Sequence, residues 1–186
     1  YTGAMFTISL LVIVLLTAGI WLYNRLVRDR NQVLAAWSDI DVQLKRRHDL
    51  VPQLVEAVRA YTSYEKATLT AVTELRARSD AASHLPEKAA IEEAMTSAVQ
   101  RLLVVAEDYP DLKADQNFRQ LQDELTEVED HIQYARRFYN GAVRQFNTRI
   151  QSFPSLLLAG PLGFQPAEFF EIEDAGERQA PRAELS

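Results

Sequence analysis

The first apolar feature of the chain is an uninterrupted run over residues 5–22, eighteen positions without a charged side chain. With Ala4 and Tyr23 the run reaches the ~20 residues that cross a ~30 Å hydrocarbon layer at 1.5 Å per residue. Trp21 and Tyr23 stand where such a helix would leave the bilayer, which is the depth that amphipathic rings prefer. The pattern predicts a transmembrane anchor over residues 1–23.

A cleaved signal peptide is the competing interpretation of this run. A signal peptide would carry positive charge before the apolar stretch and a small-residue cleavage site after it. No Lys or Arg stands in residues 1–4, and the run continues into WLYNRLVRDR at residues 21–30. We therefore favour a retained anchor. The opening YTGA is interpreted as a trimmed start or an expression remnant without structural weight.

Beyond the anchor, apolar residues recur at steps of three and four, as on one face of an α-helix, and strand-type alternation is absent. The spacing predicts an all-α fold with helices over residues 24–49, 52–82, 86–108 and 116–153. The last of these holds its spacing for about five heptads, which is typical of coiled-coil-like packing. We expect residues 24–153 to form one domain, an antiparallel up-and-down bundle with short connections, most simply of four helices.

Pro52 determines whether the first of these helices is one or two. Inside a continuous helix a proline removes a backbone hydrogen bond and kinks the axis. Alternatively Asp49 caps a new helix that has Pro52 in its first turn. An unbroken helix over residues 24–82 would be roughly 88 Å long, and the last helix would then overshoot its partners. We favour the break, although the apolar spacing continues through Pro52 and leaves a continuous helix open.

A second apolar stretch, PSLLLAGPLGF, follows the last helix and belongs to a post-bundle segment over residues 154–172. In a four-helix bundle this stretch returns to the membrane. It could lie in the headgroup zone, dock a partner, or pack on the open end of the bundle. The candidate contacts with membrane or partner are Leu156, Leu157, Leu158, Leu162 and Phe164. Residues 173–186 then form an acidic tail, predicted to be disordered or partner-binding.

The distribution of charge predicts the orientation of the chain in the membrane. Arg25, Arg28 and Arg30 follow the span, and no Lys or Arg precedes it. The positive-inside rule therefore places the N-terminus outside and the helical domain in the cytoplasm, with the opposite orientation left open. The three arginines are candidate contacts for lipid headgroups. The plainer interpretation is a solvated helix face that only sets the topology.

Composition excludes several chemistries. The chain has no cysteine, so disulfides, thiolate metal sites and cysteine nucleophiles are excluded. A net charge of −6 argues against a nucleic-acid binder, which would normally carry a basic face. A di-metal carboxylate centre needs Glu three residues before His. None of the three histidines has Glu at that position: the residues three before His48, His84 and His131 are Lys45, Ala81 and Val128. The motif of a di-metal centre is therefore absent from the sequence.

No phosphate-binding glycine loop or nucleophile-elbow motif is present in the sequence. We therefore predict no enzyme activity, no cofactor and no small-molecule substrate. A hidden hydrolase or metalloenzyme is the weakest of the hypotheses that stay open.

Three long stretches carry a family resemblance. Residues 31–61 (NQVLAAWSDIDVQLKRRHDLVPQLVEAVRAY), 117–147 (NFRQLQDELTEVEDHIQYARRFYNGAVRQFN) and 153–164 (FPSLLLAGPLGF) resemble the bacterial LemA family. The likeness ends near Ile172, and Gln53 stands where Asn is expected. The resemblance implies a single-pass anchor in the bacterial cell (inner) membrane, a short outer N-terminus, and a large inner domain built as a four-helix antiparallel bundle.

The family resemblance brings no established activity or catalytic residue set. Relatives occur beside membrane metalloprotease genes and among magnetosome proteins, which suggests membrane-associated assembly or quality control. Our hypothesis is a non-enzymatic, membrane-anchored scaffold that forms a homo-oligomer or organises other membrane proteins. Anchoring supports this because it raises the effective concentration of copies in one plane. The alternative is an adaptor or regulator of a membrane protease or quality-control complex, recognised through residues 165–186.

Overall fold

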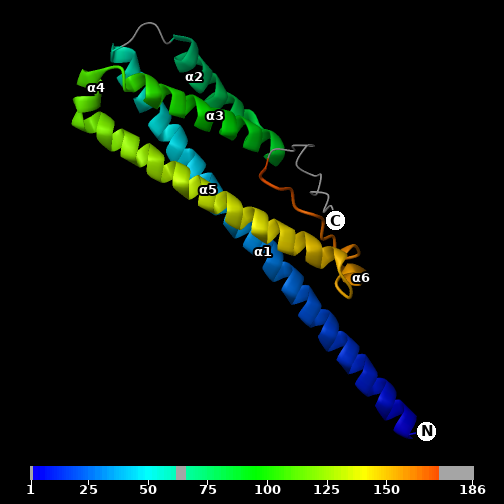
Figure 1. The fold of residues 1–186 in the computed structure, drawn as a ribbon. Helices are drawn as coiled ribbons and strands as arrows, with labels where there is room; N and C mark the ends of the chain where they lie inside the picture. The colour runs from blue at the N-terminus through cyan, green and yellow to red at the C-terminus, as the bar shows by residue number, and fades with distance from the viewer. Residues whose placement is uncertain (1, 62–65, 172–186) are drawn as a thin grey trace, which may run out of the picture. The chain divides into compact units, whose positions relative to one another are not determined.

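The computed structural model describes residues 2–61 and 66–171 of the chain (Figure 1). These residues are organised into helices without any strand, which confirms the all-α prediction for the part that the structure describes. The helices are α1 (Thr2–Tyr61), α2 (Lys66–Ala81), α3 (Leu85–Ala106), α4 (Pro110–Ala114), α5 (Gln116–Gln151) and α6 (Leu156–Ala159). The predicted acidic tail, residues 173–186, lies outside the described residues.

Helix α1 is continuous through Pro52. The prediction that Asp49 and Pro52 begin a new helix is therefore wrong. An interior proline costs about 3 kcal/mol of helix stability. On either side of it Val51, Leu54 and Val58 are buried on one face, and each such side chain contributes about 1.5–3 kcal/mol. Packing on both sides of the proline outweighs its local penalty.

The other helix boundaries follow the sequence more closely. Pro86 lies in the first turn of α3, as predicted from the missing N–H of proline. Pro110 ends the apolar run of α3 and begins α4, a five-residue helix that the spacing did not predict. At the N-terminus of α5 the Asp115 carboxylate accepts a hydrogen bond from the Phe118 N–H at 3.0 Å, which satisfies one of the free donors of that helix end.

The chain divides into two compact units, and both α1 and α5 contribute to each. Unit 1 consists of residues 1–45 and 130–168, and unit 2 of residues 46–129 and 169–186.

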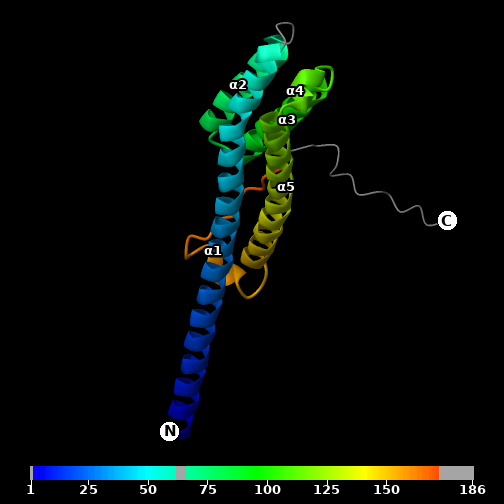
Figure 2. The same cartoon turned by 90° about the vertical axis from the view of Figure 1, so that its left-hand side faces the viewer.

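In unit 1 the first part of α1 packs along the last part of α5 (Figures 1 and 2). Trp37 contacts Tyr139 and, eight residues earlier on α1, Asp29 contacts Arg149, so the two helices run antiparallel. Their shared core is apolar and follows the predicted helical spacing: Leu26, Val33, Ala36, Ile40 and Leu44 on α1, with Ile132, Ala135, Tyr139, Ala142, Val143, Phe146 and Ile150 on α5.

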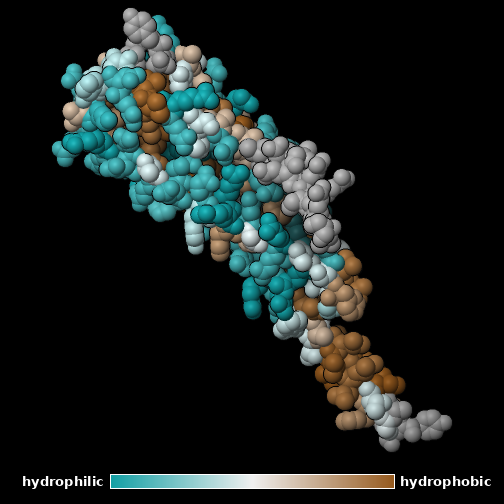
Figure 3. Space-filling view, in the orientation of Figure 1, coloured by the Kyte–Doolittle hydropathy of each residue, from teal (hydrophilic) through white to brown (hydrophobic). Residues whose placement is uncertain are grey.

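Upstream of this core, the large apolar side chains of α1 are exposed, including Met5, Phe6, Ile8, Leu10, Leu11, Val12, Ile13, Val14, Leu15 and Leu16. They form a continuous apolar surface along the helix (Figure 3). By length and composition, α1 is the one helix in the described part of the chain that could cross a membrane. Apolar surface of this extent is unfavourable in water and is expected of a helix surrounded by lipid.

Unit 2 contains segments of four longer helices: the end of α1, all of α2 and α3, and the beginning of α5. Helices α2 and α3 pack against each other as a hairpin. The core is built from Val51, Leu54, Val58, Leu69, Val72, Ile91, Met95, Ala98, Val99, Leu102, Ala106, Leu112, Phe118, Leu121, Leu125 and Val128. Each of these helices therefore buries one apolar face in the core of unit 2, as the apolar spacing of three and four residues predicts.

Candidate membrane-surface site

The candidate functional site lies in unit 1, where the apolar span of α1 ends. Trp21 and Tyr23 are 58% and 44% exposed, so both rings face outward from the helix at the end of the span. The guanidinium of Arg25 lies 5.1 Å from the centroid of the Trp21 ring, a cation–π contact. The transition from apolar to cationic surface is thus completed within about one helical turn.

Phe164 anchors the post-α5 segment beside this transition. Its ring packs edge-on against Tyr23 at 6.1 Å and against Phe146 at 6.4 Å between centroids. The Arg30 guanidinium lies 5.3 Å from the Phe164 centroid. Phe164 is only 7% exposed. The prediction that Phe164, like the leucines, contacts the membrane or a partner is therefore corrected. Phe164 is a core residue that attaches the segment to α1 and α5.

The segment that Phe164 anchors is a compact turn around α6. The Phe164 N–H donates to the Ala159 carbonyl at 2.9 Å, and Gly163 takes φ +75°, a backbone conformation that favours glycine. Ala159 faces inward and is buried. The side chains that the turn directs outward are apolar and exposed: Phe153, Leu156, Leu157 and Leu162. Leu158 is half-buried. Contact of these leucines with lipid or a partner stays a prediction.

Residues 165–168 continue back along α5 and are held there by two side chains. The Asn147 amide donates to the Ala167 carbonyl at 2.9 Å and accepts from the Ala167 N–H at 2.8 Å. The Tyr139 hydroxyl donates to the Glu168 carbonyl at 2.8 Å. Burial, together with the negative charge of Glu168, raises the pKa of Tyr139 to about 12. The beginning of the region assigned to partner recognition is therefore packed on the helix.

The three predicted headgroup arginines are all exposed. Arg25 and Arg30 are positioned by the aromatic rings of Trp21 and Phe164. Arg28 lies between these two arginines in the sequence of α1. Their contact with headgroups stays a prediction, but two of the three are held at the end of the span by specific contacts.

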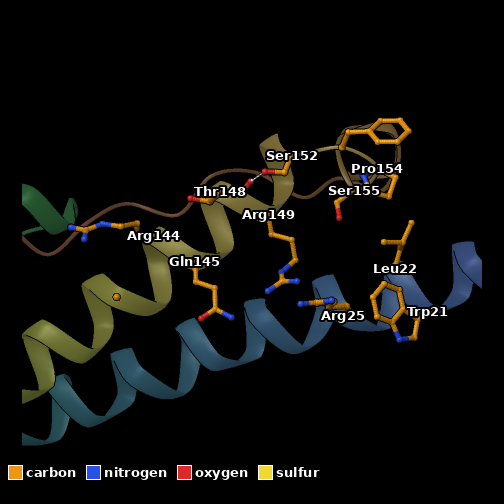
Figure 4. Close-up of a pocket in the computed structure, with 12 residues that line it drawn as sticks. Trp21, Leu22, Arg25, Arg144, Gln145, Thr148, Arg149, Ser152, Pro154 and Ser155 are labelled. Carbon is orange, nitrogen blue, oxygen red and sulfur yellow. Dashed lines mark hydrogen bonds between the residues drawn. The ribbon is translucent and has the colours of Figure 1, made fainter.

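Between α1 and α5, next to this end of the span, lies a pocket of about 710 Å³ (Figure 4). Arg149 of α5, one of the lining residues, forms an ion pair with Asp29 of α1, which is not itself a lining residue. Asp29 is 6% exposed, so its charge is compensated in a largely dry environment. Of the lining residues, Trp21 and Arg25 were singled out in the sequence, whereas those of α5 were not, because the spacing of one helix does not show which residues of another helix lie opposite.

Unit 2 contains a buried polar cluster that the sequence also did not predict. Arg47 is 2% exposed and forms ion pairs with Glu92 and, at 2.8 Å, with Glu129. It also donates to the Thr96 hydroxyl at 2.7 Å. Glu92 in addition accepts a hydrogen bond from Ser79. Four helices thereby share one connected network at the centre of unit 2.

His48 joins the same network from the next position of α1. Its Nε2 lies 2.9 Å from Glu92 Oε1, and its Nδ1 lies 3.2 Å from Asp80 Oδ1. Burial by itself would raise the pKa of Glu92, but the His48 hydrogen bond, the charge of Arg47 and the Ser79 hydrogen bond lower that pKa to about 2. Glu92 is therefore an ionised carboxylate in the core.

A signal for this cluster was present in the helical spacing. Arg47 occupies the apolar stripe of α1 between Leu44 and Val51, and Glu92 occupies that of α3 before Met95. A polar residue at a core position on each of two helices indicates a buried pair. In the part of the chain that the structure describes, no three His, Asp or Glu side chains converge to hold a metal ion. The network is a structural element of unit 2.

A model of the LemA family matches residues 36–184. The chain belongs to the LemA family. The match covers parts of both units and extends past Ile172, near which the resemblance in the sequence was expected to end.

Individual relatives agree with the assignment to the LemA family. Protein LemA of Metamycoplasma hominis is 28% identical over 182 residues, which cover 92% of this chain and 81% of that protein. Magnetosome protein MamQ 2 of Paramagnetospirillum magneticum is 26% identical over 201 residues, covering 94% and 74% of the two chains. Magnetosome protein MamQ of Magnetospirillum gryphiswaldense is 24% identical over 200 residues, covering 93% and 74%. None of these names describes an enzyme activity.

Proposed function

We propose that this LemA-family protein is a non-enzymatic, membrane-anchored helical scaffold that self-associates or organises other membrane proteins. The observation that carries the proposal is the exposed apolar surface of α1 over residues 5–22, joined without a break to a folded helical body. A linker-free junction transmits the orientation of the anchor to unit 1. Copies confined to one plane then meet at high effective concentration and in a restricted orientation.

Likeness to magnetosome proteins supports the same proposal. We propose the organisation predicted from the sequence: an anchor over residues 1–23, a helical domain over 24–153, an apolar segment over 154–172, and an acidic tail beyond it. Within unit 2 the four helical segments are proposed to act as an antiparallel bundle. The positive-inside rule supports an outer N-terminus and a cytoplasmic body in a bacterial cell membrane.

Unit 1 offers a surface for self-association beyond the span. Val42 of α1 is 57% exposed, and Tyr134 and Phe138 of α5 are 66% and 46% exposed. These three side chains line a shallow cavity of about 300 Å³ together with Asp39 and His131. Exposed apolar groups that gather at one place mark interaction sites more often than singly scattered ones do. We propose that a second copy of the chain covers this surface.

The oligomeric state of the full-length protein tests the scaffold. Light scattering or mass photometry in detergent should report an oligomer, and Val42→Asp with Phe138→Asp should shift it toward the monomer. Val104→Asp is the matched control, because Val104 is 65% exposed on α3 of unit 2. A monomer across micromolar concentrations for the unmodified chain would argue against self-association. Recovery of a membrane protease as the main partner would instead favour the adaptor.

A further inference from the structure

The pocket at the end of the span separates apolar from cationic side chains along its length. In Figure 4 Trp21, Leu22 and Pro154 lie toward the apolar span, while Arg25 and Arg149 lie further along, followed by Gln145 and Arg144. Arg25 is only about 5 Å beyond Leu22 along the helix axis, at 1.5 Å per residue. The pocket therefore spans the depth at which hydrocarbon gives way to headgroups.

The cationic part of the pocket suits a phosphate. Among the described residues that line it are three arginines and no Asp or Glu. Arg25 and Arg149 reach toward each other from α1 and α5 (Figure 4). Guanidinium groups bind phosphate oxygens through paired, charge-assisted hydrogen bonds. Thr148 and Ser155 also line the pocket and each carries a hydroxyl group.

The apolar part of the pocket distinguishes a lipid from a soluble anion. Trp21 is 58% exposed, and Phe153, also a lining residue, is 80% exposed. A phosphate bound at Arg25 would direct attached acyl chains past these rings onto the exposed surface of residues 5–22. A volume of about 710 Å³ is within the ~300–1,000 Å³ range of small-molecule sites. The cytoplasmic leaflet, which the proposed orientation places here, is rich in anionic lipid.

We propose that this pocket binds the headgroup of an anionic phospholipid, with Arg25 and Arg149 beside its phosphate, Arg144 adding positive charge at the far end of the pocket, and Trp21 and Phe153 beside its acyl chains. The assignment rests on the proposed anchoring of residues 5–22 in the bilayer. It gives the scaffold a preference for lipid composition as well as a place in the membrane.

The test is lipid binding to the delipidated, full-length protein in detergent, counted by native mass spectrometry. Phosphatidylglycerol should bind at one site about tenfold more tightly than phosphatidylcholine with the same acyl chains, because both lipids offer the phosphate but the arginines repel the positive choline group of phosphatidylcholine. Arg25→Gln with Arg144→Gln should remove this preference. Arg149 is left unchanged because it pairs with Asp29. Arg59→Gln with Arg137→Gln is the control, since both arginines are exposed on the same two helices outside the pocket.

Equal binding of the two lipids, or an equal loss in the control variant, would overturn the assignment. Binding of inorganic phosphate without any preference between the lipids would assign the pocket to a soluble anion and overturn it as well. Carbonate extraction of the same variants reports membrane insertion separately. A protein that stays inserted without lipid preference contradicts only this inference, whereas a protein released by carbonate contradicts the anchored scaffold.

Discussion

The ring of Tyr23 packs edge-on against the ring of Phe164, with centroids 6.1 Å apart and planes at 66°. Tyr23 directly follows the apolar span, and Phe164 lies 141 positions later in the chain. This contact holds the turn around α6 beside the end of the apolar span. We therefore predict that the exposed leucines of that turn lie at the membrane surface whichever way the anchored protein is oriented.

A spin label at Leu157 tests that depth. The chain has no cysteine, so Leu157→Cys gives a single labelling position. In lipid nanodiscs its nitroxide should relax faster with oxygen, which concentrates in lipid, than with a water-soluble nickel complex. Leu34→Cys is the control: Leu34 is 60% and Leu157 63% exposed, but Leu34 lies about 18 Å beyond the span along α1. Equal access of the nickel complex to both labels would place α6 in water.

Attachment of residues 165–168 to α5 depends on Asn147. Asn147→Ala removes both hydrogen bonds to Ala167, each of which contributes about 0.5–1.5 kcal/mol. We expect hydrogen exchange at the Ala167 amide to become about tenfold faster or more, since that N–H loses its acceptor. Asn24→Ala, at an exposed position of α1, should leave this exchange unchanged. Unchanged exchange in Asn147→Ala would mean that other contacts hold the segment.

Glu92→Gln should destabilise unit 2 strongly. The change leaves Arg47 buried with less compensating charge, and breaking a buried ion pair typically costs about 3–5 kcal/mol. Denaturant unfolding followed by circular dichroism in detergent measures the loss. Glu74→Gln is the control, because Glu74 is exposed on α2 and the loss there should stay within about 0.5 kcal/mol. Similar losses in both variants would show that the network is not a stabilising element.

The same carboxylate predicts a pH dependence. The pKa of Glu92 falls from 4.5 to about 2 on folding, so the folded state favours the ionised form. Its contribution, on the order of 3 kcal/mol, is present above pH 4.5 and is lost as the pH falls toward 2. The free energy of unfolding should therefore decline across that window, and the decline should be smaller in Glu92→Gln. Identical pH profiles for the two proteins would contradict the lowered pKa.

Topology can be tested with two single cysteines. A side chain fits at Gly3, where an added Cβ meets nothing within 4 Å. In intact bacteria a membrane-impermeant maleimide should label Gly3→Cys and spare Leu34→Cys, because Arg25, Arg28 and Arg30 retain their side of α1 in the cytoplasm. Lysed cells provide the control, in which both cysteines should react. Labelling of Leu34→Cys alone in intact cells would reverse the proposed orientation.

The sequence by itself determined the local features of this protein. A run of eighteen uncharged, mostly apolar residues suffices to predict an anchor, because the hydrocarbon thickness sets the length of a spanning helix. Steps of three and four predicted the α-helices, and Pro86 marked the start of α3, since both depend on neighbours within about one turn. The long motifs were enough to indicate the LemA family.

The tertiary structure decided the features that depend on distant residues. Pro52 continues α1 because side chains on both sides of it are buried against other helices. The carboxylate partners of Arg47 stand 45 and 82 positions away, so the stripe showed that Arg47 faces inward but not what compensates its charge. Phe164 is indistinguishable in sequence from its apolar neighbours, yet it packs on Tyr23 and Phe146 while they face outward. A periodic pattern specifies which face of a helix is buried, and only packing specifies what that face meets.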